Sequence, residues 1–262
     1  MGLFSNDLLA GKVALVTGGG SGINLGIARA FVAHGASVSL VGRTQDKLDR
    51  AAAELGERAA GFSADVRDPQ ALQTAISATV ERFGKIDILV NGAAGNFLAP
   101  AAQLSPNGFK TVIEIDACGT FNASRLCFEQ LVDSRGVVLN ISATQAWIPT
   151  PLQVHAGAAK AAVEKMTQDL ALEWGPFGVR VVGIAPGPID DTEGMKRLST
   201  PELRTKLQNQ MPLRRWGTVD EIGLVAVFLC SNAAAFITGT TLVADGGQSL
   251  VGATGFLEMM GG

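Results

Sequence analysis

The chain has 262 residues, of which 47% are apolar and 6% aromatic, and it contains 32 glycines and no tyrosine. This length suits one α/β domain over residues 1–262, and the net charge of −3 argues against a nucleic-acid-binding surface. The three cysteines, Cys118, Cys127 and Cys230, are odd in number and lack metal-ligand spacing. We therefore expect reduced thiols and no metal site.

Signals for export or membrane insertion are not apparent. The first residues include Asp7 and lack a basic start followed by an apolar run. No apolar stretch approaches the roughly 20 residues that a membrane helix needs. The last residues, Leu257 to Gly262, do not form a peroxisomal tripeptide. We expect a soluble, cytoplasmic protein with neither a membrane nor a nucleic-acid partner.

The first elements predict a phosphate-binding site. An apolar run over 12–17 predicts a strand, the glycine-rich run 18–23 follows it, and a helical pattern occupies 22–34. A strand, a glycine turn and a helix N-terminus direct main-chain N–H groups and the helix dipole at one point, where a pyrophosphate binds. We therefore expect a nucleotide cofactor.

Apolar runs alternate with helical patterns along the rest of the chain. They predict strands near 37–41, 59–63, 86–90, 136–142, 178–184 and 240–244, and helices near 44–55, 68–83, 106–132, 155–174 and 218–230. This alternation predicts a doubly wound parallel sheet covered on both faces by helices. The segment 187–217 interrupts it. Because ligands bind beyond the carboxyl ends of such strands, we expect this segment to form a substrate lid.

The turn after the second strand bears on the choice of cofactor. An NAD site usually places Asp or Glu there to bind the ribose hydroxyls, whereas this chain reads Val41-Gly-Arg-Thr44. Arg43 can pair with a 2′-phosphate, which favours NADPH. The alternative is that Arg43 is only a solvated loop charge.

The ordered motifs resemble the short-chain dehydrogenase/reductase family over essentially the whole chain, which implies a single Rossmann-type domain. The resemblance rests on the glycine-rich loop, Asp65-Val66, Asn91 to Gly95, Lys160 and Pro186 to Ile189. It implies that the cofactor contacts Gly18, Ser21, Gly22, Ile23, Asp65, Val66, Asn91, Ala93, Lys160, Pro186, Gly187, Ile189 and Thr192. Asn24 stands where the family has its last loop glycine, and Gly26 follows two residues later. We expect α-helix packing to differ slightly there and Asn24 to contact phosphate or ribose.

Three of the four catalytic positions of this family are changed. The usual set is Asn, Ser, Tyr and Lys. Lys160 is kept, but Ala156 stands in the tyrosine position, Ala143 in the serine position and Asp116 in the asparagine position. Ordinary carbonyl reduction needs a proton donor at the carbonyl oxygen, and two alanines supply none.

This pattern and its flanking sequence look like the peroxisomal-type 2,4-dienoyl-CoA reductases of fatty acid metabolism. The runs that carry the match are 91–98, 109–113, 119–122, 152–157, 172–176 and 185–189. The resemblance implies that hydride from NADPH adds to the far end of a conjugated dienoyl thioester and that a proton returns to carbon. A tyrosine that binds an alkoxide is then dispensable.

The resemblance also implies the catalytic roles. Lys160 is expected to hold the nicotinamide ribose, and Asp116 to orient Lys160 or a water. Glu164, one helical turn beyond Lys160, either pairs with it or holds a water, with Asp245 as a candidate partner; Asp245 otherwise caps the last strand. His155 is turned about 100° from the vacant position 156, so a packing or substrate-contact role is expected.

For the substrate, the resemblance implies an acyl pocket and a site for coenzyme A. The acyl pocket would include Asn96, Phe97, Gly119 and Thr120, although Phe97 also suits a core position. Lys196 and Arg197 would meet the phosphates of coenzyme A, or would lie on a solvated helix face.

Two other functions stay open. One is an NADP(H)-dependent alcohol dehydrogenase or ketoreductase whose acid has moved, for example to His155 or a water. The other is a non-catalytic NADP(H)-binding protein, against which the retained Lys160 argues. In each case, the two long predicted helices 106–132 and 155–174 carry apolar residues on more than one face, which predicts contact with a partner chain. The resemblance to the short-chain dehydrogenase/reductase family implies that this assembly is a homotetramer with two-fold interfaces.

Overall fold

The computed structural model describes residues 5–190, 205 and 208–253. Its seven strands are β1 Val13–Thr17, β2 Ser37–Gly42, β3 Ala59–Ser63, β4 Ile88–Asn91, β5 Val137–Ile141, β6 Arg180–Pro186 and β7 Thr241–Ala244. Its α-helices are α1 Gly22–Ala33, α2 Gln45–Leu55, α3 Pro69–Phe83, α4 Pro106–Ile113, α5 Gly119–Leu126, α6 Phe128–Ser134, α7 Val154–Trp174 and α10 Val219–Cys230.

The strands form one parallel sheet in the order β3-β2-β1-β4-β5-β6-β7. The chain moves outward from β1 to β3, returns to place β4 on the other side of β1, and then moves outward again. At this reversal, Thr17 at the end of β1 is in register with Asn91 at the end of β4. In such sheets the ligand crevice lies at this reversal point, beyond the carboxyl ends of the strands. The predicted doubly wound parallel fold is confirmed.

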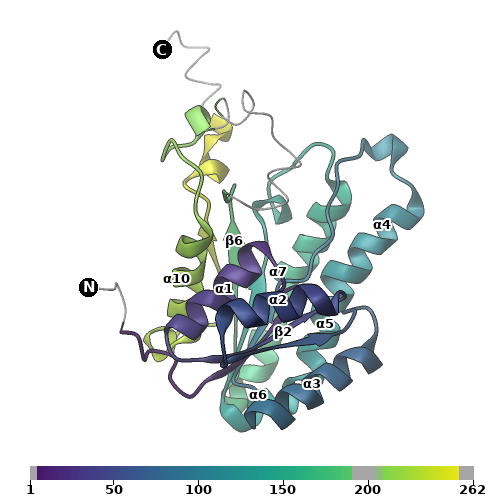
Figure 1. Cartoon of the computed structure of the whole chain (residues 1–262). Coiled ribbons are helices and arrows are strands. Elements are labelled where there is room, and N and C mark those ends of the chain that lie inside the picture. The colour runs from purple at the N-terminus through teal and green to yellow at the C-terminus, as the bar shows by residue number, and fades with distance from the viewer. Residues whose placement is uncertain (1–4, 191–204, 206–207, 254–262) are drawn as a thin grey trace.

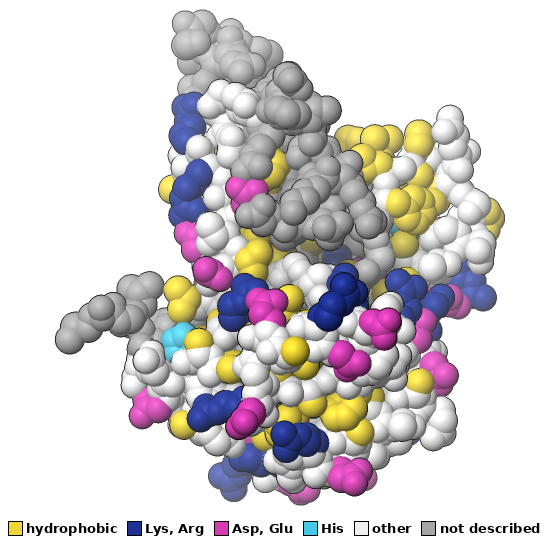
Figure 2. All heavy atoms as spheres, viewed as in Figure 1, with side chains coloured by type: hydrophobic (Ala, Val, Ile, Leu, Met, Phe, Trp, Pro, Cys, Tyr) yellow, Lys and Arg dark blue, Asp and Glu magenta, His cyan; other side chains and the backbone are white. Residues whose placement is uncertain are grey.

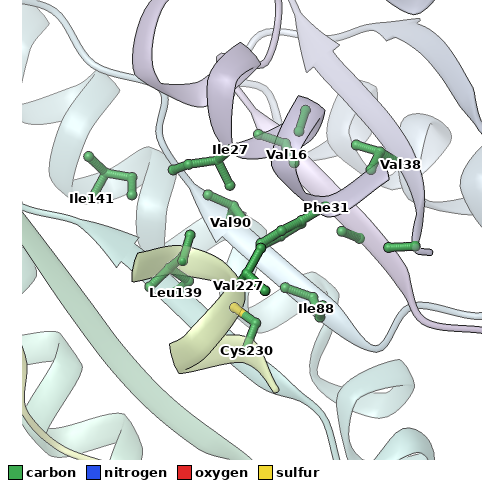
Figure 3. Close-up of a cluster of buried hydrophobic side chains, with 14 of the residues drawn as sticks. Val16, Ile27, Phe31, Val38, Ile88, Val90, Leu139, Ile141, Val227 and Cys230 are labelled. Carbon is green, nitrogen blue, oxygen red and sulfur yellow. The ribbon is translucent and has the colours of Figure 1, made fainter. Parts of the chain in front are cut away.

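Helices cover both faces of the sheet (Figure 1). Two hydrophobic clusters of buried side chains hold these layers to the sheet. The first joins α1, α2 and α10 to the sheet around Phe31, and Figure 3 shows Ile27 and Phe31 of α1 with Val227 and Cys230 of α10. The second joins α3, α5, α6 and α7 to the opposite face. Most residues of the five inner strands, β2, β1, β4, β5 and β6, are buried, which explains why these strands read as continuous apolar runs, whereas the edge strands β3 and β7 are half-buried or exposed.

The prediction of one helix over 106–132 is wrong. The chain forms α4, then a π-helical segment Glu114–Cys118, then α5, and a break at Cys127 before α6. A π-helical turn accommodates one extra residue and so rotates the side chains that follow it. Asp116 lies inside this segment, which places the irregular turn at a candidate catalytic position.

Candidate active site

The loop after β1 has the features of an anion site. Gly18 and Gly22 have φ values of +67° and +58°, which glycine adopts without strain. Ser21 precedes α1 but makes no capping hydrogen bond with its side chain, and the first turn of α1 has no acidic residue. The N–H groups of that turn are therefore available to a phosphate and face no opposing charge. These residues fit a dinucleotide.

Asn24 and Gly26 have different roles in the structure. The Nδ2 of Asn24 donates to the carbonyl oxygens of Gly92 at 2.7 Å and of Gly18 at 3.3 Å, so the amide lies between two cofactor loops. Gly26 lets α10 approach α1, because a Cβ there would lie 1.8 Å from a methyl group of Val219. The glycine two residues beyond the usual position thus permits close packing of two helices.

Three cationic side chains, Arg43, Lys47 and Arg67, follow strands β2 and β3. Arg43 follows β2 and is exposed, and its positive charge helps to lower the pKa of the Asp65 carboxyl group. The hydrogen bond from the Arg67 side chain, with an Nη2–Oδ2 distance of 2.6 Å, lowers the pKa of Asp65 below its ordinary value. The same bond raises the pKa of Arg67. The side chain of Lys47 lies over the phosphate loop, 3.4 Å from where a Cβ of Gly20 would stand.

Lys47 and Arg67 were not predicted as site residues. The available signals were local: Arg67 follows Asp65 by two residues, and Lys47 lies in the first turn of the helix after Arg43. Neither spacing shows by itself that a side chain folds back toward a phosphate loop. Val66, the other predicted adenine contact, is buried and packs against the position of Gly119.

Lys160 and Asp116 are brought together at the centre of the site, as expected. The Lys160 Nζ donates to the carbonyl oxygen of Ile141 at 2.8 Å and lies 3.3 Å from the Asp116 Oδ2. The Asp116 Oδ1 accepts a hydrogen bond from the main-chain N–H of Gly95 at 2.7 Å. Both side chains are buried. The carboxylate therefore links the loop after β4 to the ammonium on α7, and charge-assisted bonds make this link strong.

One N–H group of the Lys160 ammonium has no hydrogen-bond partner among the described residues. An ammonium has three donors, and among the described residues two partners account for two of them. The third is available to a ligand in the crevice.

Glu164 does not pair with Lys160. Its Oε2 accepts a hydrogen bond from the Thr241 hydroxyl on β7 at 2.8 Å, and its Oε1 is buried without a partner among the described residues. Asp245 accepts from the N–H groups of Gly247 at 2.8 Å and Ser249 at 2.7 Å, so it caps the turn after β7. The alternative reading of Asp245 as a cap agrees with this geometry.

The other candidates for a proton donor are enclosed. His155 is fully buried, and its ring stacks on Phe97 with centroids 4.4 Å apart. Neither ring nitrogen of His155 has a hydrogen-bond partner in the described part of the chain. Ala156 follows His155 directly, and Ala143 precedes the turn Thr144–Ala146; neither contributes a hydroxyl.

Asn91 uses its side chain inside the protein. Its Nδ2 lies 2.9 Å from both the Ser124 Oγ and the Asn140 Oδ1, which ties β4 to α5 and β5. Its Oδ1 is buried and has no partner among the described residues. Ala93 is half-buried, and its N–H donates to the Thr17 hydroxyl at 3.2 Å.

The expected nicotinamide flank follows β6. The N–H of Gly187 donates to Ala244 at 3.1 Å, and a Cβ on Gly187 would lie 2.6 Å from the Cα of Asp245. Pro186 is half-buried, whereas Ile189 is buried in the first cluster. Pro188 and Ile189 line a cavity of about 450 Å³. Thr192, Lys196 and Arg197 lie outside the described residues.

An exposed apolar surface lies beside the predicted acyl pocket. The Asn96 Nδ2 donates to Gln153 at 2.8 Å, and the Ala99 N–H donates to Leu152 at 3.0 Å, so the loop after β4 lies along the start of α7. Figure 2 shows hydrophobic side chains gathered at the upper right, over α4. We call the exposed side chains of this region the apolar rim; they are Phe97, Leu98, Phe109, Trp147, Leu152 and Val154.

Two predicted substrate residues are instead enclosed within helices. A Cβ on Gly119 would lie 2.6 Å from a methyl group of Val66, so this glycine allows α5 to approach the loop after β3. The Thr120 hydroxyl donates to the carbonyl oxygen of Asp116 at 2.6 Å, and Thr120 is buried. Both residues therefore support the π-helical segment in this structure.

Within the described ranges, no helix is long and apolar enough to cross a membrane, and no cluster of metal-binding side chains is present.

Comparisons with known proteins give consistent results. A family model described as enoyl-(acyl carrier protein) reductase matches residues 18–249. The peroxisomal 2,4-dienoyl-CoA reductase [(3E)-enoyl-CoA-producing] of Danio rerio is 45% identical over 99% of this chain and 88% of that protein. The probable 2,4-dienoyl-CoA reductase [(2E)-enoyl-CoA-producing] of Bacillus subtilis is 41% identical over 91% of this chain and 97% of that protein.

Solved structures agree with the fold. A short chain dehydrogenase from Bacillus anthracis superposes with a TM-score of 0.83 at 41% identity, covering 91% of this chain and 96% of that one. A putative short-chain alcohol dehydrogenase from Sinorhizobium meliloti 1021 superposes with a TM-score of 0.87 at 34% identity, covering 92% and 97%.

Proposed function

The chain belongs to the short-chain dehydrogenase/reductase family, in its branch of 2,4-dienoyl-CoA reductases, and from that premise we propose that it reduces a conjugated 2,4-dienoyl-CoA with a nicotinamide cofactor. The observation that carries the proposal is the buried Lys160–Asp116 pair beside two alanines. Ala143 and Ala156 offer no hydroxyl to a developing alkoxide. A conjugated thioester avoids that need, because its proton returns to carbon and its charge spreads over an extended enolate.

We propose NADPH as the cofactor, which supplies the hydride when bound. Residues 18–24 would hold its pyrophosphate, and Arg43 with Lys47 would meet the 2′-phosphate at the adenosine end. The third N–H of Lys160 would donate to the nicotinamide ribose. Asp116 would keep the ammonium in place through its own bond to Gly95. Asp65 and Val66 at the adenine, and residues 186–192 at the nicotinamide, remain proposed contacts.

The apolar rim supports an acyl substrate. A fatty acyl chain needs an apolar surface open to the crevice, and Phe97 at 42% exposure and Leu98 at 47% provide one. The hydrogen bond between Asn96 and Gln153 fixes the two loops that carry the rim. Lys196 and Arg197 stay our proposed contacts for the phosphates of coenzyme A. Because Gly119 and Thr120 are buried, they would act on the pocket only through the π-helical segment that they support.

Glu164 remains the proposed holder of a proton-relay water. Its free Oε1 is an acceptor with no partner among the described residues, and such an atom is costly to bury. The names of the relatives give different products, (3E)-enoyl-CoA or (2E)-enoyl-CoA. Product analysis by NMR would therefore identify the carbon that receives the proton in this protein.

The test is a parallel assay of NADPH consumption with a 2,4-dienoyl-CoA, a 2-enoyl-CoA and a 3-oxoacyl-CoA. Turnover of the dienoyl substrate alone is expected. Ala156→Tyr, which restores the usual family residue, should not improve dienoyl-CoA reduction. Strong reduction of the 3-oxoacyl substrate without dienoyl activity would replace the proposal with a ketoreductase whose acid has moved.

We propose further that residues 1–262 act as a single domain, that the protein works in the cytoplasm, and that it assembles as a homotetramer. The exposed apolar side chains of α5 and α7, such as Phe121 and Leu172, support assembly. For the compartment, several relatives carry "peroxisomal" in their names. Fractionation of the native cells would settle it.

A further inference from the structure

The loop after β4 is held from two sides by residues of the β1–α1 segment. The Thr17 hydroxyl accepts hydrogen bonds from the N–H groups of Gly92 at 3.1 Å and Ala93 at 3.2 Å. The Asn24 Nδ2 donates to the carbonyl oxygen of the same Gly92 at 2.7 Å. Both polar groups of Gly92 are therefore fixed by the segment that carries the phosphate loop.

Asn24 also anchors the phosphate loop itself. Its second amide hydrogen faces the carbonyl oxygen of Gly18 at 3.3 Å. Both Nδ2 hydrogens are thus used, one on each loop, at the reversal point between β1 and β4. Donation to two carbonyls also identifies the nitrogen end of this amide.

The side chain of Asn24 fills the space next to Gly92. A Cβ on Gly92 would lie 2.1 Å from the Asn24 Oδ1 and 2.4 Å from its Cγ. Gly92 does not have positive φ, so the main chain there does not require glycine. The restriction comes from the amide of Asn24: an asparagine at position 24 and any side chain at position 92 cannot both be accommodated with the main chain in this arrangement.

The Oδ1 of Asn24 is buried and has no hydrogen-bond partner in the described part of the chain. An unpaired buried acceptor lowers stability, so packing alone does not explain an asparagine at position 24. Its amide donors, which hold two loops at a fixed separation, give a reason for its presence.

We propose that Asn24 is a positioning residue that sets the separation of the two cofactor loops, and that Gly92 is its obligatory partner. The inference rests on the proposed nicotinamide cofactor, which would contact both loops at once. Loops that are already spaced for the cofactor lose less freedom when it binds. Asn24 therefore acts on cofactor affinity through Gly18 and Gly92.

The experiment measures the NADPH dissociation constant of the ligand-free protein by fluorescence, and its melting temperature, for the parent, Asn24→Gly, Gly92→Ala and the double variant. Gly92→Ala should weaken NADPH binding about tenfold or more, since small misplacements at such sites have large effects. Asn24→Gly should weaken it less. The double variant should bind better than Gly92→Ala alone, because the added methyl group then occupies the vacated space.

Gly136→Ala is the matched control. A Cβ there would lie 2.4 Å from the carbonyl oxygen of Asp87, so this change is about as crowded, but Gly136 precedes β5 and lies at the amino ends of the strands, opposite the crevice. It should lower the melting temperature and leave the NADPH dissociation constant unchanged.

Three outcomes would overturn the inference: unchanged affinity in Asn24→Gly and Gly92→Ala, additive effects in the double variant, or an equal loss of affinity in Gly136→Ala. If Gly92→Ala does not fold, the comparison of Asn24→Gly with the double variant still decides, because a coupled pair predicts nearly equal affinities. A parent protein that binds neither NADPH nor NADH would refute the proposed function as well. If the parent binds NADPH and the variants bind it with the same affinity, only this inference is refuted.

Discussion

The carboxylate of Asp116 and the ammonium of Lys160 depend on each other for their positions. Both are buried, and a charge held in such a place needs a partner. Gly95 and Ile141 supply the remaining hydrogen bonds. Loss of either side chain would leave the other as a poorly compensated buried charge and would also displace the loop after β4.

We therefore expect Lys160→Ala and Asp116→Ala each to lower kcat for a 2,4-dienoyl-CoA by about a hundredfold or more, the range of a positioned acid–base group. Steady-state kinetics at saturating NADPH provides the measurement. Lys165→Ala is the control, because Lys165 lies on the same helix in an exposed pair with Asp169. Retention of full activity by Asp116→Ala would exclude a role for this carboxylate.

Arg43 determines the expected preference for NADPH. Its removal should cost about 1.5–3 kcal/mol of NADPH binding, the range of a hydrogen bond to a charged group, with little change for NADH. The two dissociation constants, measured by fluorescence, give the preference directly. Arg50→Ala on α2 is the control, since its side chain only donates to the carbonyl oxygen of Asp46. Equal affinities of the parent for both cofactors would disprove the assignment.

Some site residues could be predicted and others could not, for a physical reason. Lys160 and Asp116 follow from motif spacing, and the structure brings them together. The position of Glu164 one turn beyond Lys160 suggested a common face, but its carboxylate accepts a hydrogen bond from Thr241 on β7 instead. Lys47 approaches the glycine-rich loop through tertiary folding, which local spacing does not encode.

At the scale of elements, tertiary contacts also explain why the sequence did not predict the structure of the segment 106–132. Helical periodicity continues across it, and no proline interrupts it after Pro106, so one helix was the natural prediction. The π-helical turn at Glu114–Cys118 depends on contacts made elsewhere: Asp116 with Gly95, and Gly119 with Val66. The periodicity of apolar residues in the sequence reveals neither of these contacts.

The first turn of α10 is stabilised by a capping box. The Thr218 hydroxyl accepts from the N–H of Glu221, and the Glu221 carboxylate accepts from the N–H of Thr218 at 2.8 Å. Thr218→Ala should lower the free energy of unfolding by about 1 kcal/mol. Urea denaturation measures this change. Because α10 packs on α1 through Gly26 and Gly223, the cap also supports the helix that begins at the phosphate loop.

The same turn predicts a pH dependence. The Arg215 side chain, by its hydrogen bond, lowers the pKa of Glu221 from 4.5 to about 2. A depressed carboxyl pKa adds stability above its unfolded value and loses it as the pH falls toward the folded value. Glu221→Gln should therefore be less stable than the parent at pH 7, and the difference should narrow below about pH 4.5. Both partners are about half exposed, so solvent reduces the effect.

The control for this comparison is Glu173→Gln, an exposed residue with no ion pair among the described residues. Its stability should follow that of the parent at every pH. A constant gap between Glu221→Gln and the parent from pH 7 to pH 3 would contradict the assigned pKa.

At the scale of the whole molecule, alternation of strands and helices was enough to predict the doubly wound sheet, because buried parallel strands need helical crossovers. The strand order is set by which faces the helices bury. Here Gly26 and Gly223 bring α1 against α10, and the order reverses between β1 and β4. The glycine-rich loop after β1 lies at that reversal, beside the loop after β4.

Two exposed apolar regions lie away from this crevice and bear on assembly. One belongs to α5 and α7, where Phe121 is 47% and Leu172 is 79% exposed. The other is β7 at the edge of the sheet, where Leu242 is 36% and Val243 is 43% exposed. A free strand edge with apolar side chains invites pairing with another chain, and two different two-fold interfaces build a tetramer.

The parent should therefore have about four times the 27.1 kDa mass of one chain in light scattering at micromolar concentration. Leu172→Glu should break the helical interface and Leu242→Lys the strand interface, each giving a dimer, and the double variant a monomer, because a buried charge without a partner opposes association. Lys165→Glu on α7 serves as the control, since its exposed position already carries a charge. If both single variants keep the parent mass, the contacts lie elsewhere, and a monomeric parent would refute the tetramer.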